Sequence, residues 1–280
     1  MSDGARVTSA GEAIRAAAAA LTPVSDTARL DAELLMAHLF GCTRSELLLR
    51  HMRDPAPPGY AALVERRAGH EPVAYITGRQ EFYGLPLIVT PATLIPRGDS
   101  ETLVEAALAL RPDAARVIDL GTGSGALLLA VLAHLRNAQG VGIDRSPEAL
   151  GVASRNAEQL GLRPQASFVA ADWHAAGWAE TLGTFDLVLC NPPYVESDAA
   201  LDRQVRDHEP ASALFAGREG LDDYRVIIPQ LRGLMNPQAV AILEIGAHQA
   251  EAVSALAAAA GFAAELRRDL AGRPRALILR

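Results

Sequence analysis

From residue 116 to residue 245 the sequence alternates between short apolar runs and longer amphipathic segments. The runs have the length of buried strands, and most of the segments between them are long enough to form helices. The expected strands are residues 116–120, 140–144, 166–171, 185–190 and 239–245, and the expected helices are residues 124–136, 147–160, 221–235 and 249–260. Such alternation is typical of a parallel sheet with helices on both faces. The sequence therefore predicts an α/β fold.

Two further segments, residues 264–270 and 276–280, follow the last expected helix. Gly261 precedes the first segment, and Gly272, Arg273 and Pro274 lie between the two. Glycine and proline at these places predict turns, so we expect an antiparallel pair of strands at the C-terminus.

The first 75 residues contain two capping boxes and no strand pattern. Ser9 with Glu12, and Thr43 with Glu46, have the spacing in which a hydroxyl and a carboxylate satisfy the first N–H groups of a helix. We therefore expect this part of the chain to form a set of short helices.

Two more helices are expected in this region, over residues 26–40 and from residue 58 to about residue 67. The former should end at Gly41 and place four apolar side chains near one face, namely Leu30, Leu34, Leu35 and Ala37. Residues 79–89 should form a hairpin that turns near Gly84. Beyond it, either Asp99 or Ser100 could cap the next helix. The expected organisation is a helical domain (1–75), a linking hairpin (76–92) and the α/β domain (93–280). The helical domain could be a lid or packing module, or it could be a substrate-recognition domain for a macromolecular substrate.

Charge and composition exclude several classes of protein. The chain has 26 basic and 33 acidic residues, a formal charge of −7 and no dense run of lysine or arginine, which disfavours a direct nucleic-acid partner. Its start has no signal-peptide pattern, and its apolar stretches are shorter than the about 20 residues of a membrane span. Two cysteines and seven histidines show no metal-ligand spacing. We expect a cytoplasmic monomer without a metal or a membrane partner.

A glycine-rich stretch closes the first expected strand of the α/β region and opens a helix. It consists of Gly121, Thr122, Gly123, Ser124 and Gly125. Glycines there let the backbone approach a ligand closely, and the helix N-terminus favours a carboxylate or a phosphate. The spacing also matches the loop that binds nicotinamide dinucleotides, so an NAD-dependent oxidoreductase is one alternative.

Acidic residues end the next two strands at the same edge of the predicted sheet. Asp144 lies about 20 residues after the glycines, where a carboxylate can accept hydrogen bonds from both hydroxyls of a ribose. Asp172 and Trp173 follow the third strand, and together they could bind an adenine ring, with the carboxylate on its amino group and the indole against its face. These residues predict an adenosine-containing cofactor.

The fourth strand ends abruptly in Asn191, Pro192, Pro193 and Tyr194. Proline has no N–H and a nearly fixed φ, so this corner should be rigid and rich in acceptors. Asn191 should project into the crevice at the carboxyl ends of the strands. An acceptor-rich pocket with an aromatic wall suits a planar –NH2 group.

These stretches together resemble the bacterial release factor glutamine methyltransferase family (PrmC, formerly HemK). The resemblance rests on DLGTGSG, Asp144, Asp172-Trp173 and NPPY, with EFYGLPLIVTPATLIPRGDSE upstream and RDHEPASALFAG downstream, and it covers residues 10–280. Gly98 and Ser100 depart from the family pattern, which reads Pro and Thr at these places. Both departures lie in the loop that contains Arg97.

The resemblance implies a seven-stranded, Rossmann-like methyltransferase sheet and S-adenosyl-L-methionine as cofactor, with S-adenosyl-L-homocysteine as product. It implies that Gly121–Gly125, Asp144, Asp172, Trp173 and Asn191 hold the cofactor. By the same resemblance, Asn191, Pro192, Pro193 and Tyr194 bind the acceptor amide together with Arg97, and Asn191, Pro192 and Tyr194 are catalytic. The implied acceptor is the glutamine in the Gly-Gly-Gln motif of class 1 peptide chain release factors.

Four alternatives share part of this pattern. A ribosomal-protein glutamine methyltransferase would have the same active site, and a DNA adenine amino-methyltransferase can use the same NPPY turn but needs a basic DNA-binding surface. A protein that only senses adenosylmethionine would leave Asn191 without a function. The NAD-dependent oxidoreductase leaves NPPY unexplained.

Overall fold

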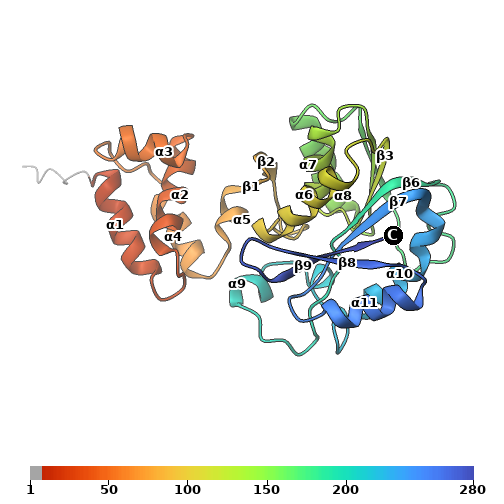
Figure 1. Cartoon of the computed structure of the whole chain (residues 1–280). Coiled ribbons are helices and arrows are strands. Elements are labelled where there is room, and N and C mark those ends of the chain that lie inside the picture. Colours follow the sequence, from red (N-terminus) through yellow and green to blue (C-terminus); the bar gives the residue numbers. More distant parts are fainter. Residues whose placement is uncertain (1–7) are drawn as a thin grey trace, which may run out of the picture. The chain divides into compact units, whose positions relative to one another are not determined.

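The computed structural model describes residues 8–280, and its ribbon is shown in Figure 1. The chain divides into two compact units. One comprises the residues up to Gly78 together with Asp202–His208, and the other comprises Arg79–Leu201 and Glu209–Arg280. The hairpin expected as a linker therefore belongs to the second unit.

The first unit is helical. Its elements are α1 (Ala10–Leu21), α2 (Ala28–Phe40), α3 (Arg44–Glu46), the π-helix η1 (Leu47–His51), α4 (Tyr60–Ala68), α5 (Val73–Thr77) and α9 (Arg203–Arg206). Ile14, Leu35 and Leu47 are fully buried in its core. The Tyr60 hydroxyl donates to the Ala32 carbonyl oxygen at 2.9 Å, which ties α4 to α2.

Both predicted capping boxes are confirmed, at Ser9 and at Thr43. α2 ends as expected at Gly41, which has a left-handed φ of 63°. The predicted face of α2 was partly wrong, because Leu30 and Leu34 are 38% and 36% exposed, respectively. Apolar residues surround this helix, so their spacing does not single out the side that packs in the core.

The second unit begins with a two-stranded antiparallel hairpin, β1 (Arg79–Phe82) and β2 (Leu85–Ile88). Its turn is Tyr83-Gly84, and both residues have positive φ, as in the tight turns that match the twist of a hairpin. Asn156 of α8 (Pro147–Gln159) anchors the hairpin, since its carboxamide exchanges hydrogen bonds with the backbone N–H and carbonyl of Ile88 at 2.7 and 2.9 Å.

A seven-stranded sheet forms the rest of this unit, in the order β5-β4-β3-β6-β7-β9-β8. The strands are β3 (Arg116–Leu120), β4 (Gln139–Asp144), β5 (Ala166–Ala170), β6 (Phe185–Cys190), β7 (Met235–Glu244), β8 (Ala264–Arg268) and β9 (Pro274–Leu279). β3 to β7 are parallel, and β9 runs antiparallel to β7 and β8. The predicted α/β fold and its C-terminal antiparallel pair are confirmed.

The remaining helices are α6 (Glu101–Leu110), α7 (Ala126–His134), α10 (Asp222–Leu234) and α11 (Ala250–Ala259), with single turns η2 (Gly98–Ser100) and η3 (Ala211–Ala213). Apolar side chains of α6 and α7 form one core cluster with the sheet, and those of α10 and α11 form another. In Figure 1, α6, α7 and α8 lie apart from α10 and α11, which agrees with the two separate core clusters. Of the two expected caps of α6, Ser100 stands at the N-cap position, but its side chain makes no capping hydrogen bond. Asp99 pairs instead with Arg273 and Arg275.

The strand order reverses at β3, because β4 and β5 lie on one side of it and β6 and β7 on the other. The carboxyl ends of β3 and β6 therefore border the crevice in which open α/β sheets bind their ligands. In the described part of the chain, no helix is long and apolar enough to cross a membrane.

Candidate active site

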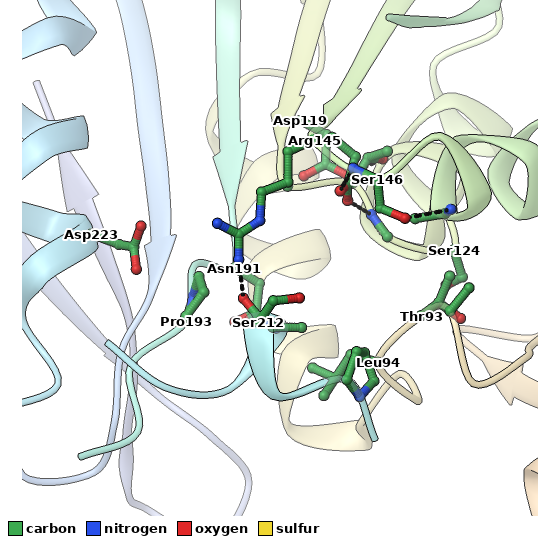
Figure 2. Close-up of a pocket in the computed structure, with 18 of the residues that line it drawn as sticks. Thr93, Leu94, Asp119, Ser124, Arg145, Ser146, Asn191, Pro193, Ser212 and Asp223 are labelled. Atoms are coloured by element: carbon green, nitrogen blue, oxygen red, sulfur yellow. Dashed lines mark hydrogen bonds between the residues drawn. The ribbon is translucent and has the colours of Figure 1, made fainter. Parts of the chain in front are cut away.

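A cavity of about 550 Å³ lies at the carboxyl ends of the parallel strands. It brings together nine of the predicted site residues: Gly121, Thr122, Gly123, Ser124, Asp144, Asp172, Trp173, Asn191 and Pro193. Figure 2 shows Asp119, Ser124, Asn191 and Pro193 around it. Gly125, Pro192, Tyr194 and Arg97 are not among the residues that line it.

The glycine-rich loop joins β3 to α7 and packs closely against the indole of Trp173. Gly121 has a φ of +73°, and a Cβ atom added there would lie 3.1 Å from Cη2 of Trp173. Gly125 packs just as tightly, because its added Cβ would lie 3.0 Å from Cδ1 of Leu129. Side chains at these positions would push the loop away from its neighbours, which explains why glycine is needed here.

Asp144 at the end of β4 is held by two backbone donors. Its Oδ2 accepts from the Gly123 N–H and its Oδ1 accepts from the Ser146 N–H, both at 2.9 Å. Each carboxylate oxygen can accept a further hydrogen bond, so the group remains able to bind two hydroxyls of a ligand.

Trp173 is oriented by a residue that the sequence did not single out. Its indole Nε1–H donates to Oδ1 of Asp223 at 2.8 Å, and Nε2 of His174 lies 3.0 Å from the same oxygen. Asp222-Asp223 opens α10, where acidic residues are ordinary, so no local pattern marks Asp223 as part of the site. Asp172 lines the cavity, and its Oδ1 accepts from the His174 N–H at 2.9 Å.

Asn191 is half-buried, directly after β6, and lines the cavity. Among residues 8–280 no group forms a hydrogen bond with its carboxamide, and none donates to the carbonyl oxygen of Pro192. The far side of the corner is fixed, because the N–H groups of Tyr194 and Val195 donate to the Leu214 carbonyl oxygen at 3.1 and 2.8 Å. The corner thus places the Asn191 carboxamide at the cavity while its other side is tied to the fold.

Tyr194 does not wall the cavity as expected. Its hydroxyl donates to Oε1 of Glu244 at 3.1 Å, and Glu244 does not line the cavity. Burial and the nearby Glu244 carboxylate both raise the pKa of the Tyr194 hydroxyl. Arg97 is also not at the lining, because its guanidinium forms an ion pair with the buried carboxylate of Glu209. Pro192 is buried and is not among the residues that line the cavity.

Two titratable groups behind the loops are strongly affected by burial. Asp119 is 1% exposed, and burial together with the negative charge of Asp144 raises its pKa to about 7. Its Oδ2 accepts from the Thr122 hydroxyl at 2.7 Å, whereas Oδ1 has no partner in the described part of the chain. Burial also raises the pKa of the Cys190 thiol well above its usual value, so this cysteine is a protonated core residue.

The cavity fits S-adenosyl-L-methionine. The unpaired Oδ1 of buried Asp119 calls for a donor or a positive charge, which the ammonium group of this cofactor would supply. Asp144 provides acceptors for a ribose, and Trp173 provides a flat surface. Within residues 8–280 no three His, Cys, Asp or Glu side chains are placed to hold a metal ion. Fold and site together define a methyltransferase of the class that uses S-adenosylmethionine.

The chain belongs to the release factor glutamine methyltransferase family. Its residues 12–78 match the family model described as the PrmC N-terminal domain, and residues 112–252 match one described as a methyltransferase domain. It is 42% identical to the release factor glutamine methyltransferase of Rhodospirillum rubrum over 90% of this chain and 78% of that protein. The enzyme of the same name from Cereibacter sphaeroides is also 42% identical, over 95% of this chain and 96% of that one.

Among solved structures, the catalytic domain of hMettl16 in complex with the MAT2A 3'UTR hairpin 6 aligns with a TM-score of 0.56. It is 16% identical and covers 70% of this chain and 76% of that one, so it supports the fold alone. The predicted family, methyltransferase class and cofactor are confirmed by the family match, and the nicotinamide interpretation of the glycine-rich loop is not supported.

Proposed function

We propose that this protein transfers a methyl group from S-adenosyl-L-methionine to the side-chain amide nitrogen, N5, of the glutamine in the Gly-Gly-Gln motif of class 1 peptide chain release factors. Relatives of the family carry the name release factor glutamine methyltransferase, which supports a release factor glutamine as the acceptor. The structural observation that carries the proposal is the Asn191 corner, whose side-chain oxygen and Pro192 carbonyl lack donors of their own in residues 8–280.

The cofactor, when bound, supplies a methyl group on a positively charged sulfur. Asp119, Asp144, Asp172, Trp173 and the backbone of residues 121–124 would hold it, because they line the cavity with acceptors, an aromatic face and close-approaching backbone.

The chain's own contribution is to orient a weak nucleophile. The lone pair of a carboxamide nitrogen is delocalised into its carbonyl group, so the nitrogen must be aligned before it can be alkylated. Oδ1 of Asn191 and the carbonyl oxygen of Pro192 would accept its two hydrogens and hold the face of the nitrogen toward the donor. Fixed alignment of this kind can lower a barrier by about 7–11 kcal/mol.

No strong base is needed for the remaining step. The nitrogen gains the methyl group and loses one proton, and a methylated, protonated amide is acidic enough to give that proton to water. S-Adenosyl-L-homocysteine is the second product. This agrees with the composition of the corner, which contains no histidine, lysine or glutamate between residues 191 and 194.

The helical unit is proposed to recognise the protein substrate. Residues 12–78 match a family model separate from that of the methyltransferase domain, so the family carries this unit in addition to the catalytic one. With a net charge of −7, a protein partner is favoured over direct contact with nucleic acid. We propose that the enzyme acts as a monomer in the cytoplasm, where release factors work.

The proposal is tested by incubating the protein with methyl-labelled S-adenosylmethionine and a purified class 1 release factor. A release factor with Gln→Ala in its Gly-Gly-Gln motif is the matched control, and ribosomal proteins and duplex DNA are offered in parallel. We expect label in the wild-type release factor only. Label that survives the Gln→Ala change, or that enters a ribosomal protein or DNA instead, would overturn the proposed acceptor.

A further inference from the structure

A buried carboxylate lies next to the Asn191 corner without being part of the cavity lining. In the sheet, Cys190 of β6 is paired with Leu243 of β7. The next residue of each strand, Asn191 and Glu244, therefore reach the same edge side by side. Glu244 is only 2% exposed, and a carboxylate so deeply buried is costly unless it is paired.

Glu244 contacts the corner through Tyr194. The Tyr194 hydroxyl donates to Oε1 of Glu244 at 3.1 Å, and Nη1 of Arg275 lies 3.9 Å from the same oxygen. The backbone of Glu244 is fixed as well, since its carbonyl oxygen accepts from the Tyr224 hydroxyl at 2.6 Å. Arg275 in turn donates to Oδ2 of Asp99 at 3.0 Å, so the carboxylate is held in a rigid, charged surrounding.

Ser100 lies close enough to Glu244 for its side chain to lower the pKa of that carboxyl against the effect of burial, but the contact falls outside good hydrogen-bonding geometry. Within residues 8–280, four buried side-chain atoms lack a partner in hydrogen-bonding geometry: Ser100 Oγ, Asp119 Oδ1, Glu244 Oε2 and Arg275 Nε. Asp119 and Ser100 line the cavity, and the atoms of Ser100, Glu244 and Arg275 belong to one cluster. Unsatisfied groups of this kind destabilise a fold, and they concentrate where function requires a particular placement.

Tyr194 is the side chain through which the corner can be held from this cluster. The two prolines have no N–H groups, and no group of the described chain bonds to the Asn191 carboxamide. The backbone of Tyr194 is attached on its other side, where its carbonyl oxygen accepts from Nε2 of Gln249 at 3.0 Å. The side-chain bond to Glu244 is therefore a third attachment of Tyr194, next to its N–H on Leu214 and its carbonyl oxygen on Gln249.

We propose that Glu244 is a positioning residue for methyl transfer: by holding the Tyr194 hydroxyl, it aims the Asn191 oxygen and the Pro192 carbonyl at the acceptor amide. Glu244 does not touch either substrate, and it acts through Tyr194. The proposal rests on the function proposed above, and it predicts that loss of the Tyr194–Glu244 bond impairs turnover more than binding.

The test compares Glu244→Ala, Tyr194→Phe and the double variant with the wild type, using full-length protein and a release factor. We expect kcat to fall roughly tenfold or more in each single variant, since small misplacements of reacting groups have effects of this order. The KM for the release factor and the calorimetric Kd for S-adenosylmethionine should stay within about twofold. Because the bond is shared, the double variant should be no slower than the slower single variant. Glu244→Gln keeps the acceptor oxygen and should recover most of the kcat.

Asp186→Ala is the matched control. Asp186 lies at the opposite end of the same strand as Cys190, and its Oδ2 accepts from the N–H groups of Ala115 and Arg116 at 2.9 Å. Its loss should lower the melting temperature and leave kcat unchanged well below that temperature. If kcat instead falls together with the melting temperature in both Asp186→Ala and Glu244→Ala, the Glu244 effect is structural and the proposal is overturned. A kcat within twofold of the wild type in Glu244→Ala or Tyr194→Phe would also overturn it, as would additive losses in the double variant.

Crystal structures of the wild type and of Glu244→Ala give a readout that does not depend on the acceptor. Residues 191–194 should be displaced or disordered in the variant, and an unchanged corner would contradict the proposed role. If the wild type fails to methylate the release factor, the proposed function fails, and the structures still decide whether Glu244 holds the corner.

Discussion

The two halves of the cavity differ in whether their acceptors are already hydrogen-bonded within the described chain. On the cofactor side, at the ends of β3 and β4, backbone N–H groups are turned toward side chains, and both oxygens of Asp144 already accept from Gly123 and Ser146. On the acceptor side, at the end of β6, the Asn191-Pro192-Pro193 corner offers oxygen acceptors, and two of its residues have no N–H to donate.

This difference separates binding from turnover. A cofactor with hydroxyl and ammonium groups is bound by fixed acceptors that the backbone orients in advance, so changes on that side should act mainly on affinity. An amide that must be aligned for attack needs free acceptors in a rigid corner, so changes there should act mainly on kcat. Variants on each side of the cavity test whether the effects on cofactor affinity and on kcat can be separated.

The largest effect is expected for Asn191→Ala. Removing the oxygen that orients the acceptor nitrogen should lower kcat by about 1000-fold, comparable with the loss of a transition-state hydrogen bond in other enzymes. The Kd for S-adenosylmethionine should change less than about threefold, because the cofactor side is untouched. Single-turnover methylation of a release factor and titration calorimetry measure the two quantities.

Asn236→Ala is a control of the same residue type at the far end of the sheet. Asn236 Nδ2 donates to Oδ1 of Asp186 at 2.7 Å, so its loss should cost about 1 kcal/mol of stability and leave methyl transfer intact. Near-normal turnover in Asn191→Ala would contradict the role assigned to the corner.

Second in size is Asp144→Ala, which acts on the cofactor side. The variant loses the acceptor of the ribose hydroxyls and the anchor of the Gly123 N–H, and hydrogen bonds to a charged group contribute about 1.5–3 kcal/mol each. We expect the Kd for S-adenosylmethionine to rise about 100-fold, with kcat at saturating cofactor reduced far less. The exposed Asp113, which pairs with Arg111, serves as the control, and Asp113→Ala should bind normally. Unchanged affinity in Asp144→Ala would show that this carboxylate does not hold the ribose.

The sequence alone indicated most residues of both halves of the cavity, because residues such as Asp144 and Asn191 lie directly at the end of an apolar run. A run such as residues 185–190 predicts a buried strand, and the residue after it must lie at the carboxyl edge of a parallel sheet. Asp144 and Asn191 could therefore be placed without knowing any contact between distant segments.

Residues that act across long separations could not be found in this way. Asp223 reaches Trp173 over 50 positions, and Glu244 reaches Tyr194 over the same distance. Both stand in ordinary sequence surroundings, one at a helix start and one at a strand end. The prediction that Tyr194 walls the cavity was wrong for the same reason, since the buried carboxylate of Glu244 on another strand decides where the Tyr194 hydroxyl points.

Asp119 is the exception within the cofactor side, because its Oδ1 has no donor in the described residues. Burial raises its pKa from 3.8 to about 7. In the unfolded chain the carboxyl ionises first as pH rises, so between about pH 4 and 7 the folded state holds the extra proton and stability falls with rising pH. Above about pH 7 the contribution is constant. Because the carboxyl faces a cavity that water can enter, we expect the free energy of unfolding to fall by about 2 kcal/mol over this pH range, less than the full pKa shift implies.

Urea unfolding of the wild type and of Asp119→Asn at several pH values measures this contribution. The difference between the two proteins removes the effects of other titrating groups, such as Glu244, whose pKa burial also raises. The wild type should lose stability relative to the variant between pH 4 and 7. Parallel pH profiles would show that Asp119 ionises normally in the folded protein.

The smallest effect concerns the contact between Gly121 and the Trp173 indole. In Gly121→Ala the new Cβ would lie 3.1 Å from Cη2 of Trp173 and would occupy a backbone conformation with a φ of +73°. Gly161→Ala is matched in φ, at +70°, but nothing lies within 4 Å of its added Cβ. Both variants should lose about 1 kcal/mol of stability from the left-handed backbone. Only Gly121→Ala should also weaken the binding of S-adenosylmethionine, by roughly tenfold, because the new Cβ displaces the indole. The kcat at saturating cofactor should stay near that of the wild type. Equal Kd values in the two variants would mean that backbone strain alone explains Gly121, and a selective fall in kcat would contradict the separation of binding from turnover between the two sides of the cavity.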